Sequence, residues 1–140
     1  MDILAGLITA AAVVGLGYAT RQGRSLPFYS TVLIVIALSY VLFAAMAEEA
    51  RPIMVESTVA VSFVAMAVAA ARFAKRRAAV YLVAVGLVAH GGYDFVHHAL
   101  VPNPVVPGWW PVFCGTVDLA LGGWVVVLGE RGRLGASPTG

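Results

Sequence analysis

Long apolar runs dominate the chain, and each is separated from the next by a short polar or proline-rich segment. A helix needs about 20 consecutive apolar residues to cross the hydrocarbon core of a bilayer. Five runs meet or nearly meet that length, and they cover residues 3–20, 27–47, 52–71, 78–100 and 109–128. The pattern therefore predicts an all-α fold, an integral membrane bundle of five transmembrane helices.

The segments between these runs have the composition of turns. Residues 21–25 are polar and lead into Pro27, which suits the first turn of a helix. Residues 48–51 form a short polar hairpin, and residues 72–77 form a basic linker. Residues 101–108 contain three prolines, which exclude a helix because proline lacks an N–H donor and restricts the residue before it.

No linker is long enough to separate domains, so we expect one transmembrane domain over residues 1–128. Residues 129–140 contain glycine, serine and proline, and the composition predicts a flexible cytoplasmic tail.

The composition requires an apolar solvent around the folded chain. Hydrophobic residues make up 61% of the 140 residues and charged residues 11%, whereas soluble domains carry about 25% charged residues. A small soluble domain buries only about 60–70% of its surface, so it could not hide this much apolar area. The lipid bilayer is therefore the expected partner. The net charge of +2 does not indicate nucleic acid, because the basic residues lie in short clusters between apolar runs.

The basic residues also predict the orientation of the chain. If successive runs cross the membrane in alternating directions, eight of the nine lysines and arginines fall on one side, and only Arg51 falls on the other. Basic residues are enriched on the cytoplasmic side, which predicts an N-terminus outside and a C-terminus inside. The alanine-, valine- and glycine-rich runs favour a plasma membrane, of the bacterial inner-membrane type.

The run over residues 78–100 carries four ionisable side chains, His90, Asp94, His97 and His98. Such a group costs about 2.5–3.5 kcal/mol at the centre of a membrane helix, so it marks a candidate functional site. At 100° per residue the four fall within an arc of about 100°, on one stripe of the helix. Gly91 and Gly92 interrupt this stretch and would let a neighbouring backbone or a ligand come close.

Further acids lie at a similar depth on other runs. Asp118 is about 13 Å below Trp109, and His90 is about 12 Å below His98, at 1.5 Å per helical residue. Glu49 lies in the hairpin between the second and third runs, and Glu56 lies one turn into the third run. The predicted topology places all of these groups in the outer half of the membrane.

Imidazole and carboxylate groups from several helices are the ligands of metal sites in helical bundles. We therefore expect a divalent metal ion, zinc or iron, with candidate ligands His90, Asp94, His97, His98, Asp118, Glu49 and Glu56. His90, Asp94 and Asp118 are the candidate catalytic residues. The structural alternatives are a buried His90–Asp94 pair that only stabilises the bundle, histidines 97 and 98 that face water or headgroups, and a Glu56 that only favours the start of its helix.

The His97–His98 pair, with His90 upstream, resembles one histidine box of the membrane di-iron desaturases and hydroxylases. That family uses several such boxes, whereas this chain has three histidines in all, so carboxylates would have to replace the missing ligands. The wider pattern, from His90 through the proline-rich segment to Cys114 and Asp118, resembles a small bacterial family of five-helix membrane proteins. That second resemblance implies the fold and no activity.

These features favour a small membrane enzyme that acts on a lipid-like or isoprenoid-like substrate, by metal-dependent or acid/base chemistry. A proton or metal-ion transporter is the first alternative, in which the polar stripe would be a relay. An accessory subunit of a membrane complex is the second. A homo-oligomer could build a pore at its axis, which keeps the transport alternative open.

Overall fold

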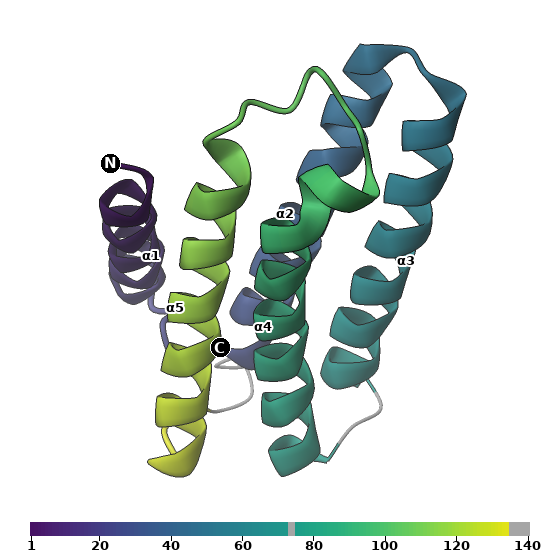
Figure 1. Cartoon of the computed structure of the whole chain (residues 1–140). Coiled ribbons are helices and arrows are strands. Elements are labelled where there is room, and N and C mark those ends of the chain that lie inside the picture. The colour runs from purple at the N-terminus through teal and green to yellow at the C-terminus, as the bar shows by residue number, and fades with distance from the viewer. Residues whose placement is uncertain (73–74, 135–140) are drawn as a thin grey trace.

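The computed structural model describes residues 1–72 and 75–134, and within these residues the chain is all-α (Figure 1). It contains five helices, as the apolar runs predict. They are α1 (Asp2–Ala19), α2 (Leu26–Ala47), α3 (Ala50–Arg72), α4 (Arg76–Leu100) and α5 (Trp110–Glu130).

Each helix begins and ends within two residues of the predicted limits. The turn between α2 and α3 is tight, because Glu48 adopts a left-handed conformation with φ 55° and ends α2. At the other end of the chain, α5 continues beyond the expected limit of residue 128 to Glu130, and Leu134 is buried. Of the expected tail, residues 129 and 130 belong to α5, residues 131–134 follow it directly, and residues 135–140 lie outside the described residues.

All five helices are long and apolar enough to cross a membrane, with a mean hydropathy of 1.5 to 2.3. Large apolar side chains such as Leu4, Val35 and Val61 are exposed on their outer surfaces. A soluble protein rarely exposes so much apolar surface, whereas a bilayer accommodates it. The chain is a multi-pass membrane protein.

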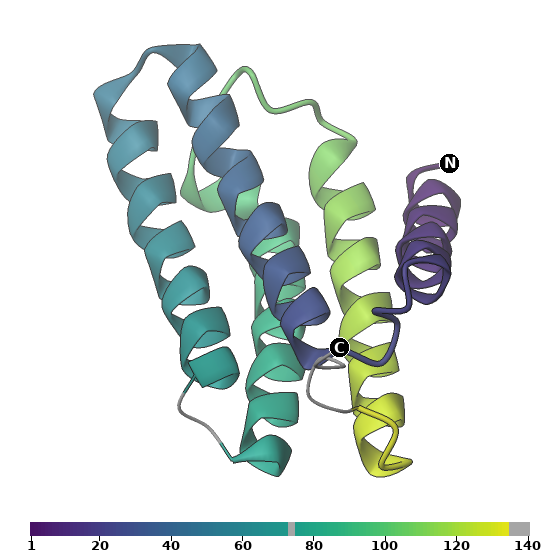
Figure 2. The same cartoon turned by 180° about the vertical axis from the view of Figure 1, so that it is seen from behind.

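In the bundle α4 lies between α3 and α5, and α2 packs on α3 and also contacts α4 (Figures 1 and 2). The tight α2–α3 turn and the loop over residues 101–109 lie at the same end, which is uppermost in Figure 1 and is called the upper end below. α1 packs mainly against α5 and stands apart from α3 and α4.

Most of the lower half of the core is apolar, although Tyr29 and Ser30 of α2 are also buried there. Leu33, Val83, Leu87, Leu121 and Val125 come from α2, α4 and α5 and are fully buried. Since α4 ascends and α5 descends, these side chains lie below the polar residues of the upper half. These apolar side chains thus lie directly below the candidate site.

Gly6 sets the distance between α1 and α5. A Cβ atom at Gly6 would approach the carbonyl oxygen of Phe113 and the Cβ of Thr116 to 2.8 Å. In α1, both Gly6 and Ala10 are buried, as expected of a small-xxx-small pair. Gly15, in the same helix, has no neighbouring atom within 4 Å of such a Cβ.

Gly6→Ala should therefore weaken the packing of α1 on α5. Overpacking costs about 1–3 kcal/mol, and the gain in helix propensity of about 1 kcal/mol offsets only part of it. We expect a lower thermal unfolding midpoint in detergent for Gly6→Ala and an unchanged or higher midpoint for Gly15→Ala. Equal midpoints for the two variants would show that α1 is not held by this contact.

Candidate functional site

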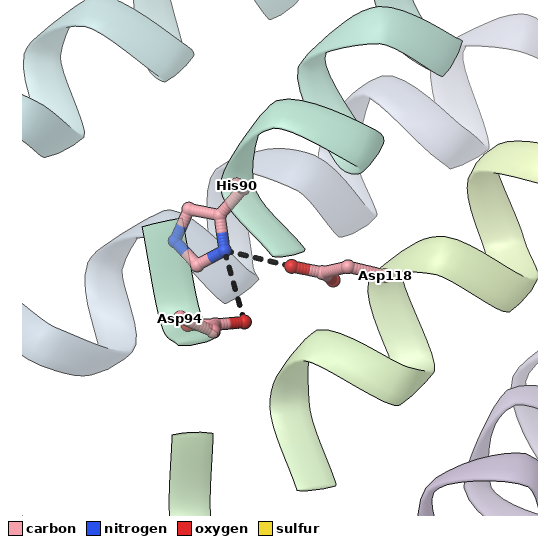
Figure 3. Close-up of side chains that lie close together, drawn as sticks. All are labelled: His90, Asp94 and Asp118. Carbon is pink, nitrogen blue, oxygen red and sulfur yellow. Dashed lines mark hydrogen bonds and ion pairs between the residues drawn. The ribbon is translucent and has the colours of Figure 1, made fainter. Parts of the chain in front are cut away.

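Three ionisable side chains meet inside the upper half of the bundle: His90 and Asp94 of α4 and Asp118 of α5 (Figure 3). All three are buried, with exposed fractions of 1%, 0% and 0%. Nδ1 of His90 lies 2.7 Å from Oδ2 of Asp118 and 3.7 Å from Oδ2 of Asp94. One potential ligand atom of each residue lies within 4.8 Å of the other two. These residues are called the His–Asp–Asp group below.

Two glycines let Asp118 reach the residues of α4. His90 and Asp94 are four residues apart, so they share one face of α4. On that face a Cβ at Gly91 would come within 3.0 Å of both the carbonyl oxygen of Gly115 and the Cβ of Asp118. A Cβ at Gly115 would lie 3.1 Å from the carbonyl oxygen of Gly91. Side chains at either position would push the two helices apart and separate Asp118 from His90.

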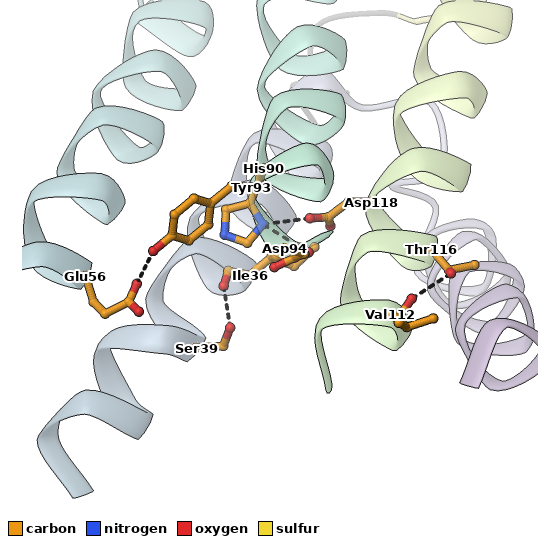
Figure 4. Close-up of polar contacts among 9 residues, drawn as sticks. All are labelled: Ile36, Ser39, Glu56, His90, Tyr93, Asp94, Val112, Thr116 and Asp118. Carbon is orange, nitrogen blue, oxygen red and sulfur yellow. Dashed lines mark hydrogen bonds and ion pairs between the residues drawn. The ribbon is translucent and has the colours of Figure 1, made fainter. Parts of the chain in front are cut away.

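A second polar group joins α3 to α4. Oε1 of Glu56 lies 2.6 Å from Nε2 of His97. The hydroxyl of Tyr93 donates to Oε2 of Glu56 at 2.9 Å (Figure 4). Glu56 and His97 are buried. Glu56 therefore has a partner for each carboxylate oxygen, and these bonds tie α3 to the helix that carries His90.

Tyr40 of α2 lies between the two groups. Its ring stacks on His97 with a centroid distance of 4.0 Å and an interplanar angle of 16°. The same ring is 6.1 Å from the ring of His90 and 5.9 Å from that of Tyr93. Four helices, α2 to α5, thus contribute to one continuous polar and aromatic region.

Several buried polar atoms in this region have no hydrogen-bond partner among the described residues. They are both carboxylate oxygens of Asp94, Oδ1 of Asp118, the hydroxyl of Tyr40 and Nδ1 of His97. A buried polar group without a partner costs about 1–3 kcal/mol, and a charged one costs more. The cost is greatest at Asp94, whose nearest opposite charge would be a protonated His90 at 3.7 Å.

The His–Asp–Asp group has the composition of a divalent metal site. Two carboxylates and one neutral imidazole balance the charge of a divalent cation, and catalytic zinc sites commonly use three protein ligands with one open position. The 2.7 Å contact between His90 and Asp118 is shorter than the ligand separation of about 3.3 Å around tetrahedral zinc. Binding a cation would require a rotation of the Asp118 carboxylate, whose other oxygen has no hydrogen-bond partner in the described part of the chain.

The structure does not bring all of the expected ligands together. His98 is exposed, because it follows His97 by one residue and is therefore rotated by about 100° around α4. Glu49 is also exposed, since it lies in the α2–α3 turn. Within the described residues, the seven candidate ligands thus divide into the His–Asp–Asp group, a separate Glu56–His97 pair and two exposed side chains, His98 and Glu49.

Sequence reasoning did not select Tyr40 or Tyr93 as parts of the site. The run over residues 27–47 is apolar on all sides, so its buried face is hidden in the sequence. In the structure Leu33, Ala37, Tyr40 and Ala44 form that face, at spacings of three and four residues. In the sequence, the feature that could have indicated Tyr40 is a tyrosine within an apolar run of a chain that carries three histidines on another run.

No protein-family model, curated protein or solved structure shows a significant match to this chain.

Removing Glu56 should destabilise the bundle strongly, because His97 and Tyr93 would both lose a buried partner. We expect Glu56→Ala to lower the free energy of unfolding by about 2–4 kcal/mol, as hydrogen bonds to charged groups contribute about 1.5–3 kcal/mol each and are not additive. Glu49→Ala removes an exposed carboxylate and should change the free energy of unfolding by less than about 0.5 kcal/mol. Unfolding of both variants in detergent measures the difference. If Glu56→Ala is as stable as Glu49→Ala, the hydrogen bonds of Glu56 do not stabilise the packing of α3 on α4.

Gly91→Ala should separate α4 from α5 at the site, whereas Gly92→Ala provides a matched control. A Cβ at Gly92 would have no neighbouring atom within 4 Å. We expect Gly91→Ala to be less stable than Gly92→Ala by about 1–3 kcal/mol, since it overpacks a helix interface. Thermal unfolding compares the two, and identical midpoints would argue against the close approach of α4 and α5.

Proposed function

We propose that the chain is a small membrane enzyme whose His–Asp–Asp group binds one divalent cation, zinc or iron, and acts on a lipid-like substrate. One observation carries the proposal: Asp94 is completely buried in a membrane-spanning bundle, and neither of its carboxylate oxygens has a hydrogen-bond partner among the described residues. Ionisable groups at such depth are costly, and where they occur they usually serve function.

A bound cation would account for this burial. The carboxylates of Asp94 and Asp118 together carry two negative charges, which a divalent ion neutralises with His90 as a neutral ligand. Such an ion supplies a Lewis acid that polarises a substrate oxygen or activates water. The surrounding side chains exclude bulk water, because Leu87 and Leu121 seal the group from below and Phe63 packs edge-on against His90 at 4.9 Å. The group contains one of the three histidines, so it offers no support for a di-iron site of the desaturase type.

The proposed orientation has the upper end outside and the N-terminus outside, since the basic residues of the lower end would face the cytoplasm. In this orientation the site lies in the outer half of a plasma membrane, for which we propose the inner membrane of a bacterium. A lipid substrate would then reach the site from the outer leaflet.

Acid/base catalysis without a metal is the second form of the same proposal. The 2.7 Å contact between His90 and Asp118 is already a hydrogen bond, as in a histidine–carboxylate pair that transfers protons. The metal content of the purified protein separates the two forms.

Transport is less well supported by the arrangement. A path for protons or metal ions needs polar groups through the whole membrane. The core below Asp118 consists mostly of apolar side chains such as Val83, Leu87 and Val125, and its buried polar side chains, Tyr29 and Ser30, lie near the lower end. Uptake of protons or divalent cations into proteoliposomes would support the transport alternative. A stable complex with another chain after mild extraction would support the accessory-subunit alternative. A homo-oligomer would remain compatible with transport, because a pore could form at its axis.

Metal analysis of protein purified without a polyhistidine tag tests the proposal. We expect about one zinc or iron ion per chain in the wild type and loss of that ion in Asp94→Asn, which keeps the size of the side chain and removes its charge. His98→Ala, a change at an exposed histidine, should retain the ion. Wild-type protein that neither contains a metal nor takes up added Zn²⁺ or Fe²⁺ would overturn the metal form, and equal metal contents in all three proteins would exclude Asp94 as a ligand.

A further inference from the structure

A pocket with a volume of about 390 Å³ lies at the lower end of the bundle, between the start of α4 and the end of α5 (Figure 1). Its walls include Arg76, Arg77 and Tyr81 of α4, Glu130 of α5 and, beyond α5, Leu134. The volume falls within the range of about 300–1,000 Å³ that small-molecule sites occupy. About 14 Å of helix separates Tyr81 from His90, so this pocket is distinct from the His–Asp–Asp group.

Two hydrogen bonds between α4 and the end of α5 hold the polar wall of the pocket in place. Nη2 of Arg76 donates to the carbonyl oxygen of Gly132 at 2.9 Å. Gly132 has φ 63°, a conformation that favours glycine, and it turns the chain after α5. The hydroxyl of Tyr81 donates to Oε1 of Glu130. The guanidinium of Arg76 and the carboxylate of Glu130 are therefore both fixed by contacts across the two helices.

The charge around the pocket is positive. Its walls carry two arginines against one carboxylate, that of Glu130, which already accepts a hydrogen bond. Residues 75–77 and 129–134 together contain five basic side chains and one acid, and all five basic side chains are exposed. The start of α4 and the end of α5 have opposite partial charges, so the two helix dipoles largely offset each other. The side chains thus favour an anion.

Arginine is suited to a phosphate in particular. Its guanidinium group has five N–H donors in a planar fork that matches two phosphate oxygens at once. The bond from Arg76 to Gly132 uses one of these donors. Arg77 lines the same pocket, one residue further along α4. Two neighbouring guanidinium groups beside one pocket are therefore typical of a phosphate site.

An exposed apolar strip runs upward along α4 from the pocket. Tyr81, Val85 and Val88 are spaced by four and three residues, so they share one face of the helix, and all three are exposed. From Arg76 to Val88 the helix rises by about 18 Å, which is comparable with half of a hydrocarbon core of about 30 Å. A ligand with a phosphate in the pocket could therefore lay an acyl chain along this strip, within one leaflet.

We propose that this pocket binds the phosphate of an anionic phospholipid, such as phosphatidylglycerol, whose acyl chains lie along the strip on α4. Basic pockets between membrane helices on the cytoplasmic side are known to bind anionic head groups. In the proposed orientation the lower end faces the cytoplasm, so the lipid belongs to the inner leaflet. The inference does not depend on the proposed enzyme function, because it uses none of the residues of the His–Asp–Asp group.

The head group, and not the acyl chain, distinguishes this lipid from the others of the bilayer. A zwitterionic lipid such as phosphatidylcholine also has a phosphate, but its quaternary ammonium group would lie among the same basic side chains. Phosphatidylglycerol has the phosphate without the cation. Two lipids with identical acyl chains should therefore differ in affinity for the pocket.

Native mass spectrometry of the full chain in detergent tests the inference. The protein is titrated with dioleoyl phosphatidylglycerol or dioleoyl phosphatidylcholine, and the lipids bound per chain are counted. We expect one phosphatidylglycerol to bind several-fold more tightly than phosphatidylcholine. Equal affinities for the two lipids would overturn the inference.

A matched pair of double variants tests the position of the site. Arg76→Gln/Arg77→Gln should lose the preference for phosphatidylglycerol. Arg21→Gln/Arg24→Gln removes two exposed arginines from the same end of the bundle, outside the pocket walls, and should retain it. Equal losses in the two pairs would show that the overall charge of the lower end attracts the lipid, and would overturn the pocket. If the first pair does not fold, Arg77→Gln alone leaves the bond from Arg76 to Gly132 and should still weaken the preference several-fold.

Glycerol 3-phosphate distinguishes a lipid from a soluble phosphate. It has the phosphate of the head group and no acyl chain, so we expect no displacement of phosphatidylglycerol by an equal concentration of it. Displacement at equal concentration would overturn the assignment of the pocket to a lipid.

Discussion

The close approach of α4 and α5 at Gly91 and Gly115 is the constraint on which the site depends. The backbones meet there because neither helix carries a side chain at the crossing. In lipid, such approaches are stabilised by packing and by interhelical polar contacts, since apolar burial offers little advantage there. The bond between His90 and Asp118 is one of these contacts. The same crossing that holds the bundle together therefore creates the buried acidic site.

The division of the core into a polar upper half and an apolar lower half follows from the sequence of α4. Its first part supplies Val83 and Leu87, and its second part supplies His90, Asp94 and His97. Glu56 of α3 and Tyr40 of α2 meet only the second part, so α2 and α3 close the site from the side opposite α5. α1 takes no part in this enclosure. It leaves instead an apolar lateral groove between itself, α2 and α5.

The fold could be predicted from hydropathy almost completely, because twenty-residue apolar runs and proline-rich breaks leave few alternatives. The meeting of His90 and Asp94 with Asp118 was also predictable, from helical spacing and from equal depth. The rotation of His98 out of the site was not, since an arc of about 100° does not determine which edge faces the neighbours. Tyr40 was hidden for a related reason: a membrane helix is apolar on its lipid-facing and its buried sides alike, so its pattern does not reveal its inner face.

The pairing of Glu56 with His97 shows a further limit of sequence reasoning. Both residues were expected as ligands of one site, but each has a closer partner in the other. Which acid neutralises which histidine depends on the azimuthal rotation of α3 and α4, and composition carries no information on that angle. Asp94 has no hydrogen-bond partner among the described residues and only the 3.7 Å contact with His90, and this buried carboxylate is the basis of the proposed function.

An experimental density map of the tag-free protein, with anomalous diffraction recorded above and below the zinc and iron absorption edges, tests the central claim most directly. The account predicts one anomalous peak inside the upper half, about 2.0–2.2 Å from a nitrogen of His90 and from carboxylate oxygens of Asp94 and Asp118. It would be contradicted by a peak bound elsewhere, or by a map of metal-supplemented crystals in which the direct His90–Asp118 hydrogen bond persists and no peak lies beside Asp94.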